Sequence, residues 1–342
     1  MKRVAILFAM IIVPGAVMLA QDINFSQFYE LPLLRNPALA GIYRGDIRVT
    51  SAFRNQWGSV TVPYQTQALG IETRFGPGQS GDFISLGLQL TNDLAGDSKM
   101  GKTQIFPMFT YHKWIGDNEN SYLSLGFIGG PVLQRFDPSK LRFSDQFVNG
   151  AYHATNPTRQ TFSKTSKTYW DAAAGISFSS ETGNGIQYYL GAAYFHFTQP
   201  KVAFDQAQDI RLNKKFVVNA GMSLPAGDRD RLILYADHFM QGGHSQTQGG
   251  ALYKHDLLLE EADYGISIAI GAFYRWNDAI IPAVKLGYYK WALGFTYDAN
   301  ISKLKTASQG RGGMEVTLSF SDFLKFRNSE LKRLDCKQID FY

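Results

Sequence analysis

The sequence predicts an all-β fold, a transmembrane antiparallel up-and-down β-barrel of about 14 strands with an extended N-terminal segment. Three observations predict this class. Apolar residues alternate with polar or small residues along many segments, turn-forming residues separate these segments, and no apolar run beyond residue 20 reaches the length of a transmembrane helix. Most alternating segments are close to the roughly ten residues that a tilted membrane-crossing strand needs.

The first residues have the pattern of a cleaved signal peptide. A basic tripeptide is followed by an almost wholly apolar stretch over 4–19, and Ala20 offers a small residue for cleavage. The alternative is a membrane anchor, but Pro14-Gly15 interrupts an apolar run that is already short for spanning a bilayer. We therefore expect residues 1–20 to be removed on export.

Residues 21–45 precede the first alternating segment and have no period of their own. They contain aromatic residues, two prolines and the Asn36-Pro37 pair, which favours a turn. We expect the prolines to keep the segment extended. Two roles are open, because the segment could plug its own barrel or dock a periplasmic partner through its aromatic side chains. The residues expected to act in either role are Phe25, Gln27, Phe28, Tyr29, Asn36 and Pro37.

Residues 46–323 form the expected barrel, because their alternation has a period of two. At its start, Ile47 and Val49 share one face, while Arg48 and Thr50 share the other. The same alternation recurs at 69–75, 84–90, 264–271, 293–301 and 314–320. Turn-forming stretches separate the strands at 76–82, 92–97, 116–120, 181–185 and 225–230.

Two further features fit a membrane barrel. A segment at about 136–167 is irregular and polar, so we expect an external loop there. Aromatic residues gather near segment ends, where Tyr and Trp prefer the membrane interface; they include Phe106, Tyr111, Trp114, Tyr274, Trp276, Tyr288, Tyr289 and Trp291.

The alternative fold class is a soluble β-sandwich or propeller, whose strands would also alternate. The small and polar residues on one face, the even strand length and the lack of intervening helices favour the barrel.

Charged residues on the polar strand faces have two interpretations. We expect them to form salt bridges in the lumen that satisfy one another. The alternative is a polar conduit for a translocating chain, and a barrel of this size is compatible with both. The residues concerned are Arg48, Arg54, Arg74, Asp171, Asp237 and Asp298.

Nothing in the sequence marks a catalyst, a cofactor site or a metal site. The six His residues lack ligand spacing, and nothing activates Ser245 for a pairing with His238 or His244. The net charge falls from +5 to +3 once the two basic residues of the signal peptide leave, with 32 basic residues against 29 acidic ones. This small excess does not suggest nucleic acid as a partner. Cys336 is the only cysteine, so an internal disulfide is excluded.

Four blocks of the sequence resemble the PorP/SprF family of outer-membrane proteins associated with type IX secretion and gliding motility. They are "QDINFSQFY…PLLRNPALAG" at the start of the mature chain, "FRNQWGSV" at 53–60, "YFHFTQPKVAF" at 194–204 and the long stretch 271–320. The resemblance therefore spans essentially the whole mature chain. The family-motif residues, expected to be structural, are Arg54, Gln56, Trp57, His196, Pro200, Trp276, Asp278, Tyr297 and Asp298.

The resemblance implies a non-catalytic barrel in the cell outer membrane that assists secretion, or surface assembly, of a large cargo such as an adhesin. It implies contact with outer-membrane lipid and with periplasmic and outer-membrane components of the type IX secretion machinery. One departure lies in 324–342, the expected periplasmic tail, where Cys336 is followed by Lys337 and not by proline. The alternative function is a passive outer-membrane channel or uptake porin for small solutes, and a third is a barrel hydrolase.

Overall fold

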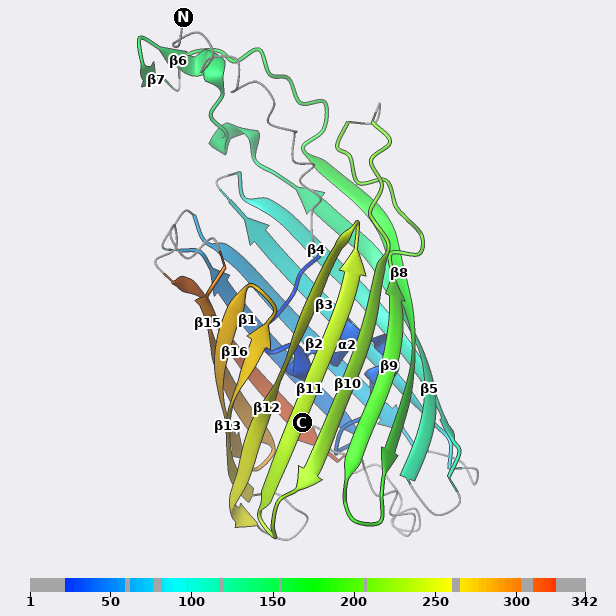
Figure 1. Cartoon of the computed structure of the whole chain (residues 1–342). Helices are drawn as coiled ribbons and strands as arrows, with labels where there is room; N and C mark the ends of the chain where they lie inside the picture. Colours follow the sequence, from blue (N-terminus) through cyan, green and yellow to red (C-terminus); the bar gives the residue numbers. More distant parts are fainter. Residues whose placement is uncertain are drawn as a thin grey trace, which may run out of the picture.

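The computed structural model describes residues 22–58, 62–76, 81–96, 98–116, 120–153, 155–205, 208–259, 265–302 and 310–323. The expected signal peptide at 1–20 and the expected tail at 324–342, which contains Cys336, lie outside these described residues. Figure 1 shows a tilted barrel with its N-terminal turns enclosed by the strands and one long loop rising from the upper end.

Fourteen strands of the described part of the chain close into one antiparallel sheet, which confirms the predicted fold class and strand number. The strands are β1 (Ile47–Gln56), β2 (Tyr64–Phe75), β3 (Phe83–Ala95), β4 (Met100–Trp114), β5 (Asn120–Arg135), β8 (Ser166–Glu181), β9 (Gln187–Phe195), β10 (Lys215–Pro225), β11 (Asp230–Gln241), β12 (His244–Leu259), β13 (Gly265–Arg275), β14 (Ala279–Tyr288), β15 (Trp291–Asn300) and β16 (Arg311–Asp322).

The first and last strands close the sheet. The register of β1 on β16 runs from Ile47 opposite Asp322 to Gln56 opposite Gly313. Hydrocarbon offers no hydrogen-bond partner to a backbone N–H or C=O group, so a sheet that crosses a bilayer has to be free of open edges. The continuous register of β1 on β16 meets this requirement.

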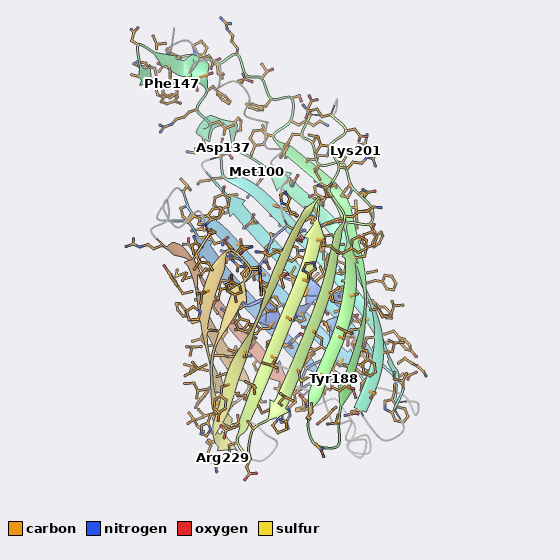
Figure 2. The ribbon with its side chains drawn as sticks, viewed as in Figure 1. Met100, Asp137, Phe147, Tyr188, Lys201 and Arg229 are labelled. Atoms are coloured by element: carbon orange, nitrogen blue, oxygen red, sulfur yellow. The ribbon has the colours of Figure 1, made fainter. Side chains whose placement is uncertain are left out.

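The two faces of the sheet differ as the alternation predicts. In β14, Ile280 and Leu286 point outward and are 47% and 49% exposed, whereas Ile281 and Ala283 face the lumen and are buried. Large apolar side chains are likewise exposed on strands around the barrel, among them Phe109, Leu190, Phe216 and Phe295. Figure 2 shows side chains projecting outward from the strands in view. An outer surface with so many exposed apolar side chains is unfavourable in water but suits the hydrocarbon core of a membrane.

Aromatic residues near the strand ends divide between the two faces. Trp276, Tyr288 and Trp291 are exposed, as expected for side chains at a membrane interface. Phe106 is an exception to our expectation, because it faces the lumen and is buried. Its position in the alternation of β4, one residue from the exposed Ile105, explains the difference.

The two ends of the barrel are unequal. One end, here called the loop end, carries the long connections 136–165 and 196–214. The first contains the 3-10 turns η3 (Pro138–Lys140) and η4 (Ser144–Gln146) and the hairpin of β6 (Phe147–Val148) and β7 (Ala151–Tyr152). The other end, the turn end, has short connections and also holds the start of β1 and the end of β16. In Figure 2, Phe147 and Lys201 mark the loop end, and Tyr188 and Arg229 mark the turn end.

Residues 22–45 lie inside the barrel and form three short helical turns. These are η1 (Phe28–Glu30), α2 (Pro32–Arg35) and η2 (Pro37–Leu39). The last turn packs against β4, β5, β8 and β9. Within the described ranges, no helix has the length and apolar character needed to cross a membrane.

The prolines act differently from our expectation that they keep this segment extended. Pro32 and Pro37 occupy the first turns of α2 and η2. Proline is favourable there, because its fixed φ suits a helix and its missing N–H would have no intrahelical partner. The enclosing lumen supplies the packing that makes such short turns stable.

Candidate functional site

The candidate site is the lumen, which segment 22–45 crosses from one end to the other. At the loop end, the Asp22 carboxylate lies 3.1 Å from Lys102 Nζ, 3.4 Å from Lys215 Nζ and 3.5 Å from His196 Nε2. His196 Nδ1 in turn lies 2.6 Å from an Asp171 carboxylate oxygen. We call these five residues the Asp22 cluster. It anchors the first described residue to the starts of β4 and β10 and to β8.

Burial and nearby charges have opposite effects on the pKa values of Asp22 and His196, the two residues of this cluster that lie outside the strands. Burial by itself raises the pKa of Asp22, but Lys102, Lys215 and His196 hold that pKa well below its usual value. Burial by itself lowers the pKa of His196, but the carboxylates of Asp171 and Asp22 raise it overall. Both groups are therefore stabilised in their charged forms.

Below the cluster, the chain is held by a buried charge network of two arginines and two acids. The Glu315 carboxylate accepts hydrogen bonds from the backbone N–H groups of Ser26 at 2.6 Å and Gln27 at 2.8 Å. Arg54 lies 3.1 Å from both Asp298 and Glu315, and Arg275 lies 3.0 Å from Asp298. The positive and negative charges balance, which buried ions require.

Aromatic stacking holds the next turn. Tyr29 stacks on Tyr235 and Phe273, with ring centroids 5.1 and 4.9 Å apart. Phe28 meets Phe273 edge-on at 5.5 Å. Phe25, Phe28 and Tyr29 are each at most 3% exposed. The aromatic residues singled out from the sequence are therefore buried in the lumen.

Asn36 and Pro37 press against glycines of the barrel wall. Asn36 Nδ2 donates to the carbonyl oxygens of Ile176 at 3.1 Å and Ala192 at 3.3 Å. A Cβ atom on Gly126 would lie 2.4 Å from the Pro37 carbonyl carbon, and one on Gly175 would lie 1.9 Å from Asn36 Oδ1. These strand glycines make room for the segment.

The segment leaves the lumen at the turn end. The Tyr43 hydroxyl lies 3.0 Å from the backbone oxygen of Glu72 and 3.2 Å from that of Asp46, and its single proton is donated to one of the two. Arg48 lies 2.6 Å from a Glu72 carboxylate oxygen. Burial, followed by the nearby Glu72 charge, raises the pKa of the Tyr43 phenol well above its usual range. Its hydroxyl therefore stays protonated and remains a donor.

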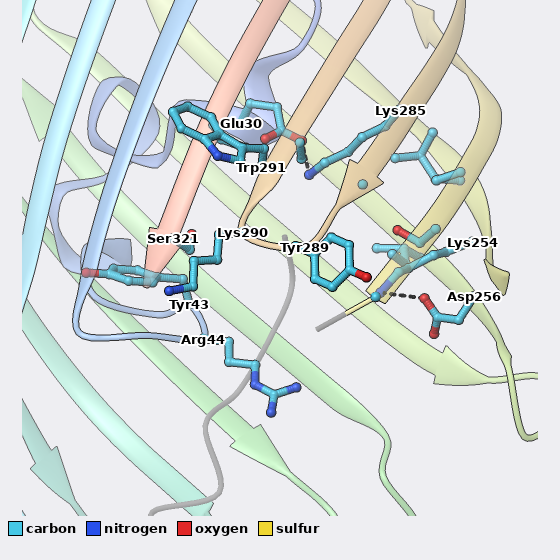
Figure 3. A pocket seen from close by; sticks show the side chains of 18 of the residues that line it. Glu30, Tyr43, Arg44, Lys254, Asp256, Lys285, Tyr289, Lys290, Trp291 and Ser321 are labelled. Carbon is cyan, nitrogen blue, oxygen red and sulfur yellow. Dashed lines mark hydrogen bonds and ion pairs between the residues drawn. The ribbon is translucent and has the colours of Figure 1, made fainter. Parts of the chain in front are cut away.

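A cavity of about 140 Å³, here called the vestibule, lies between this part of the segment and the turn end. Figure 3 shows Lys254, Lys285 and Arg44 around the same space, with the Tyr289 ring beside Lys254. The inner wall is formed by Tyr29, Glu30 and Tyr43 of the segment.

The charged residues singled out from the sequence do lie in the lumen, but several find partners that the sequence did not indicate. Arg54 pairs with Asp298 as expected of lumen salt bridges. Asp237 instead binds Arg35 of the segment, and Asp171 binds His196. The only sequence signal for Arg35 was a basic residue within an otherwise largely apolar and aromatic stretch. Other residues that sequence reasoning missed are Asp22, Glu72, Lys102, Lys215, Arg275 and Glu315.

The family-motif residues separate into two groups. Arg54, Asp298 and His196 are buried and hold the segment, and Asp278 lies 3.1 Å from Arg275 of the charge network. The remaining family-motif residues lie away from these contacts with the segment. Gln56 ends β1, Trp57 packs edge-on against Tyr64, Pro200 accepts a hydrogen bond from Leu212 N in a loop, Trp276 is 63% exposed, and Tyr297 points outward.

Candidate chemistry elsewhere in the described residues is limited. Those residues hold no group of three or more His, Cys, Asp or Glu side chains arranged to bind a metal ion. His238 contacts Thr247 at 2.8 Å. His112 lies between Ser85 and Ser124, but all three side chains are buried beneath the segment.

Comparison with known proteins identifies a family and several distant folds. A family model described as type IX secretion system membrane protein PorP/SprF matches residues 17–320. Comparison with curated proteins found no match. Among solved structures, the CymD monoaromatic hydrocarbon channel is 10% identical, with a TM-score of 0.45, over 91% of this chain and 96% of that one.

Two further solved structures are similarly distant. A TodX deltaS2S3 mutant monoaromatic hydrocarbon channel is 10% identical, with a TM-score of 0.46, over 85% of this chain and 93% of that one. CdiB from Acinetobacter baumannii is 9% identical, with a TM-score of 0.40, over 80% of this chain, which spans only 60% of CdiB. Structural similarity at such low sequence identity and TM-score gives no information about what this chain binds.

Proposed function

This chain belongs to the PorP/SprF family of type IX secretion system membrane proteins, and we propose that it is a plugged, non-catalytic barrel that assists secretion or surface assembly of a large cargo such as an adhesin. The barrel lies in the outer membrane. Its partners in this proposal are periplasmic and outer-membrane components of the secretion machinery, and its activity would extend to gliding motility.

The observation that carries the proposal is the filled lumen. Segment 22–45 is bound at the loop end by Asp22, in the middle by Ser26 and Gln27, and at the turn end by Tyr43. A passive channel needs a continuous open path, which this arrangement does not favour. We therefore assign residues 22–45 a plug role and not the role of a free arm.

The orientation of the barrel follows from its loops. Outer-membrane barrels have short periplasmic turns and longer external loops. The loop end, with 136–165 and 196–214, is thus assigned to the cell exterior, and the turn end to the periplasm. With this orientation Asp22 lies at the external end of the lumen, and the segment runs from there toward the periplasm.

The test combines cargo display with conductance. A strain lacking this chain, complemented with the wild-type chain, should regain surface display of its cargo, and an affinity pull-down from native outer membranes should identify secretion components. Purified protein in planar bilayers should show no steady conductance. Steady solute-selective conductance together with normal cargo display in the deletion strain would contradict the proposal and favour the passive channel.

A further inference from the structure

The outer wall of the barrel carries an aromatic patch at the loop end, on the neighbouring strands β8, β9 and β10 (Figure 1). The Tyr194 ring of β9 stacks on the Phe216 ring of β10, with their centroids 4.5 Å apart. The Phe197 ring lies 6.5 Å from that of Tyr194 and is 43% exposed. Trp170 of β8, which is 70% exposed, lies on the same wall nearer the loops. We call these four side chains, together with Lys214, the β8–β10 patch.

A change in backbone conformation turns Phe197 onto this wall. Phe195 ends β9 and is buried, so regular alternation would point His196 outward and Phe197 inward. His196 has a φ of 59°, in the left-handed region, which interrupts the alternation. His196 is therefore buried like Phe195, and Phe197 is exposed beside Tyr194. The same turn completes the aromatic patch outside and the Asp22 cluster inside.

Lys214 adds a positive charge to this aromatic surface. It is exposed, directly precedes β10 and lies two residues before the outward-facing Phe216. Its Nζ atom is 5.9 Å from the centroid of the Tyr194 ring. The ammonium group thus lies over the aromatic patch at the end of the strands, where lysines with apolar stems commonly lie in membrane proteins.

The charge of Lys214 is not neutralised by the described residues, because no carboxylate among them lies within ion-pair distance of its Nζ atom. Asp209, the nearest acid in the sequence, instead lies 3.0 Å from Lys201 and 3.3 Å from Arg211. The undescribed residues of this connection, 206–207, are Gln and Ala and carry no charge. An ammonium group has three N–H donors, so Lys214 can bind an anion without losing an existing ion pair.

The outer wall becomes more apolar from Lys214 toward the middle of the barrel. The Tyr194–Phe216 ring pair lies next below Lys214, followed by Val218 and then by Leu190, which are 48% and 58% exposed. A lipid has the same order of groups, because its charged phosphate lies at the membrane interface and its acyl chains lie beneath. Since this wall of a membrane barrel faces the bilayer, a lipid is the ligand that can contact all of these levels.

We propose that the β8–β10 patch is a binding site for an anionic, phosphate-bearing lipid of the outer leaflet, with the lipid phosphate at Lys214 and an acyl chain along the Tyr194–Phe216 ring pair. Basic side chains at a membrane surface attract anionic head groups. The leaflet follows from the orientation assigned above, in which the loop end faces the cell exterior. Binding of the lipid itself depends neither on that orientation nor on cargo secretion.

Native mass spectrometry of the purified, detergent-solubilised protein tests this site. The probe is dioleoylphosphatidic acid. The matched lipid is dioleoylphosphatidylcholine, which has the same acyl chains and no net charge. We expect a saturable one-to-one complex with phosphatidic acid and binding at least about tenfold weaker for phosphatidylcholine, the loss expected for a weakened charge-assisted contact.

Single variants locate the site. Lys214→Gln should weaken binding of phosphatidic acid by about tenfold and leave binding of phosphatidylcholine almost unchanged. Phe216→Ala should weaken binding of both lipids, because it removes apolar surface beneath the acyl chain. Lys164→Gln is the control, because Lys164 is an exposed lysine of the connection 136–165, and it should change neither affinity. The heat-induced shift in electrophoretic mobility verifies that each variant is folded.

Three results would overturn the proposal. They are no saturable complex with phosphatidic acid, equal affinities for the two lipids, and equal effects of Lys214→Gln and Lys164→Gln. Displacement of phosphatidic acid by millimolar inorganic phosphate would also overturn it, because the site would then recognise a small anion and not a lipid. Absence of the complex together with normal cargo display would contradict this inference and leave the proposed function intact.

Discussion

Arg35 and Asp237 form a two-point ion pair across the lumen. Arg35 Nε lies 2.7 Å from one carboxylate oxygen of Asp237 and Nη2 lies 2.5 Å from the other, and Nη2 also donates to the Tyr189 hydroxyl at 2.9 Å. The side chains are 5% and 4% exposed. The pair joins α2 of the segment to β11, and the Arg35 guanidinium also lies 5.0 Å from the centroid of the Phe28 ring. It is thus a central contact between plug and wall.

Removing one partner of this pair should destabilise the barrel. Arg35→Ala leaves the Asp237 carboxylate buried without its guanidinium, a change that typically costs about 3–5 kcal/mol. The measurement is the temperature of the mobility shift on electrophoresis. Lys113→Ala, which breaks an exposed pair with Asp82, should leave that temperature almost unchanged, because water screens an exposed ion pair. Equal shifts in the two variants would show that Arg35 does not hold the plug.

Substitutions on the two faces of β13 should differ in cost. Ile268→Arg places a charge on the lipid face and should cost about 2–4 kcal/mol if the residue lies near the midplane. Ser267→Arg should be milder, because Ser267 lines the vestibule, where there is space. Membrane-inserted protein and its unfolding temperature are compared for both variants. Equal damage would mean that the assignment of the faces is wrong.

The double variant Phe25→Ala with Phe28→Ala separates a plug from a partner-binding arm. Both side chains are 3% exposed in the lumen. Truncating a buried Phe to Ala leaves a cavity and typically lowers the free energy of unfolding by about 3–5 kcal/mol per site. We expect a lower unfolding temperature and the appearance of conductance in planar bilayers. Unchanged stability with reduced cargo display would instead indicate that these residues dock a partner.

The Asp22 cluster should hold the segment best between mildly acidic and neutral pH. Asp22 has a depressed pKa, so its contribution is present above the usual value of 3.8 and is lost as pH falls through the lower folded value. His196 has a raised pKa, so its contribution is complete below the usual 6.5 and is lost as pH rises through the higher folded value.

Hydrogen exchange of residues 22–28 measures this pH dependence. Protection should decline on the alkaline side as His196 loses its proton, and again in strong acid. His196→Gln should abolish the alkaline decline and leave the acid one, whereas His153→Gln, an exposed loop substitution, should change neither. An alkaline decline that persists in His196→Gln would assign it to another group.

The glycines beneath the segment should resist even a small side chain. Gly126→Ala places a methyl group 2.4 Å from the Pro37 carbonyl carbon, so plug or wall has to shift, at a typical cost of about 1–3 kcal/mol. Gly183→Ala is the control, because a methyl group there meets nothing within 4 Å. Comparable unfolding temperatures for both variants would mean that the segment does not press on this wall.

Much of the barrel could be predicted from the sequence, because the alternation of a strand is a local property. Ile47 and Arg48 differ in polarity, and a strand necessarily places neighbours on opposite faces. The same rule assigned Ile268 to the outside and Ser267 to the lumen, as the structure places them. The strand number followed from counting such segments.

The candidate site depended on the tertiary structure. Arg35 and Asp237 are 202 residues apart, and Ser26 and Glu315 are 289 apart, so no local pattern relates them. The prolines of the segment also allowed more than one backbone conformation, and only the confined lumen selected short helical turns. The sequence by itself therefore determined which residues face lipid and which face the lumen, because backbone geometry enforces that alternation. Closure of the sheet decided which lumen residues meet and where the segment lies, because burial requires each charge to find a partner across the barrel.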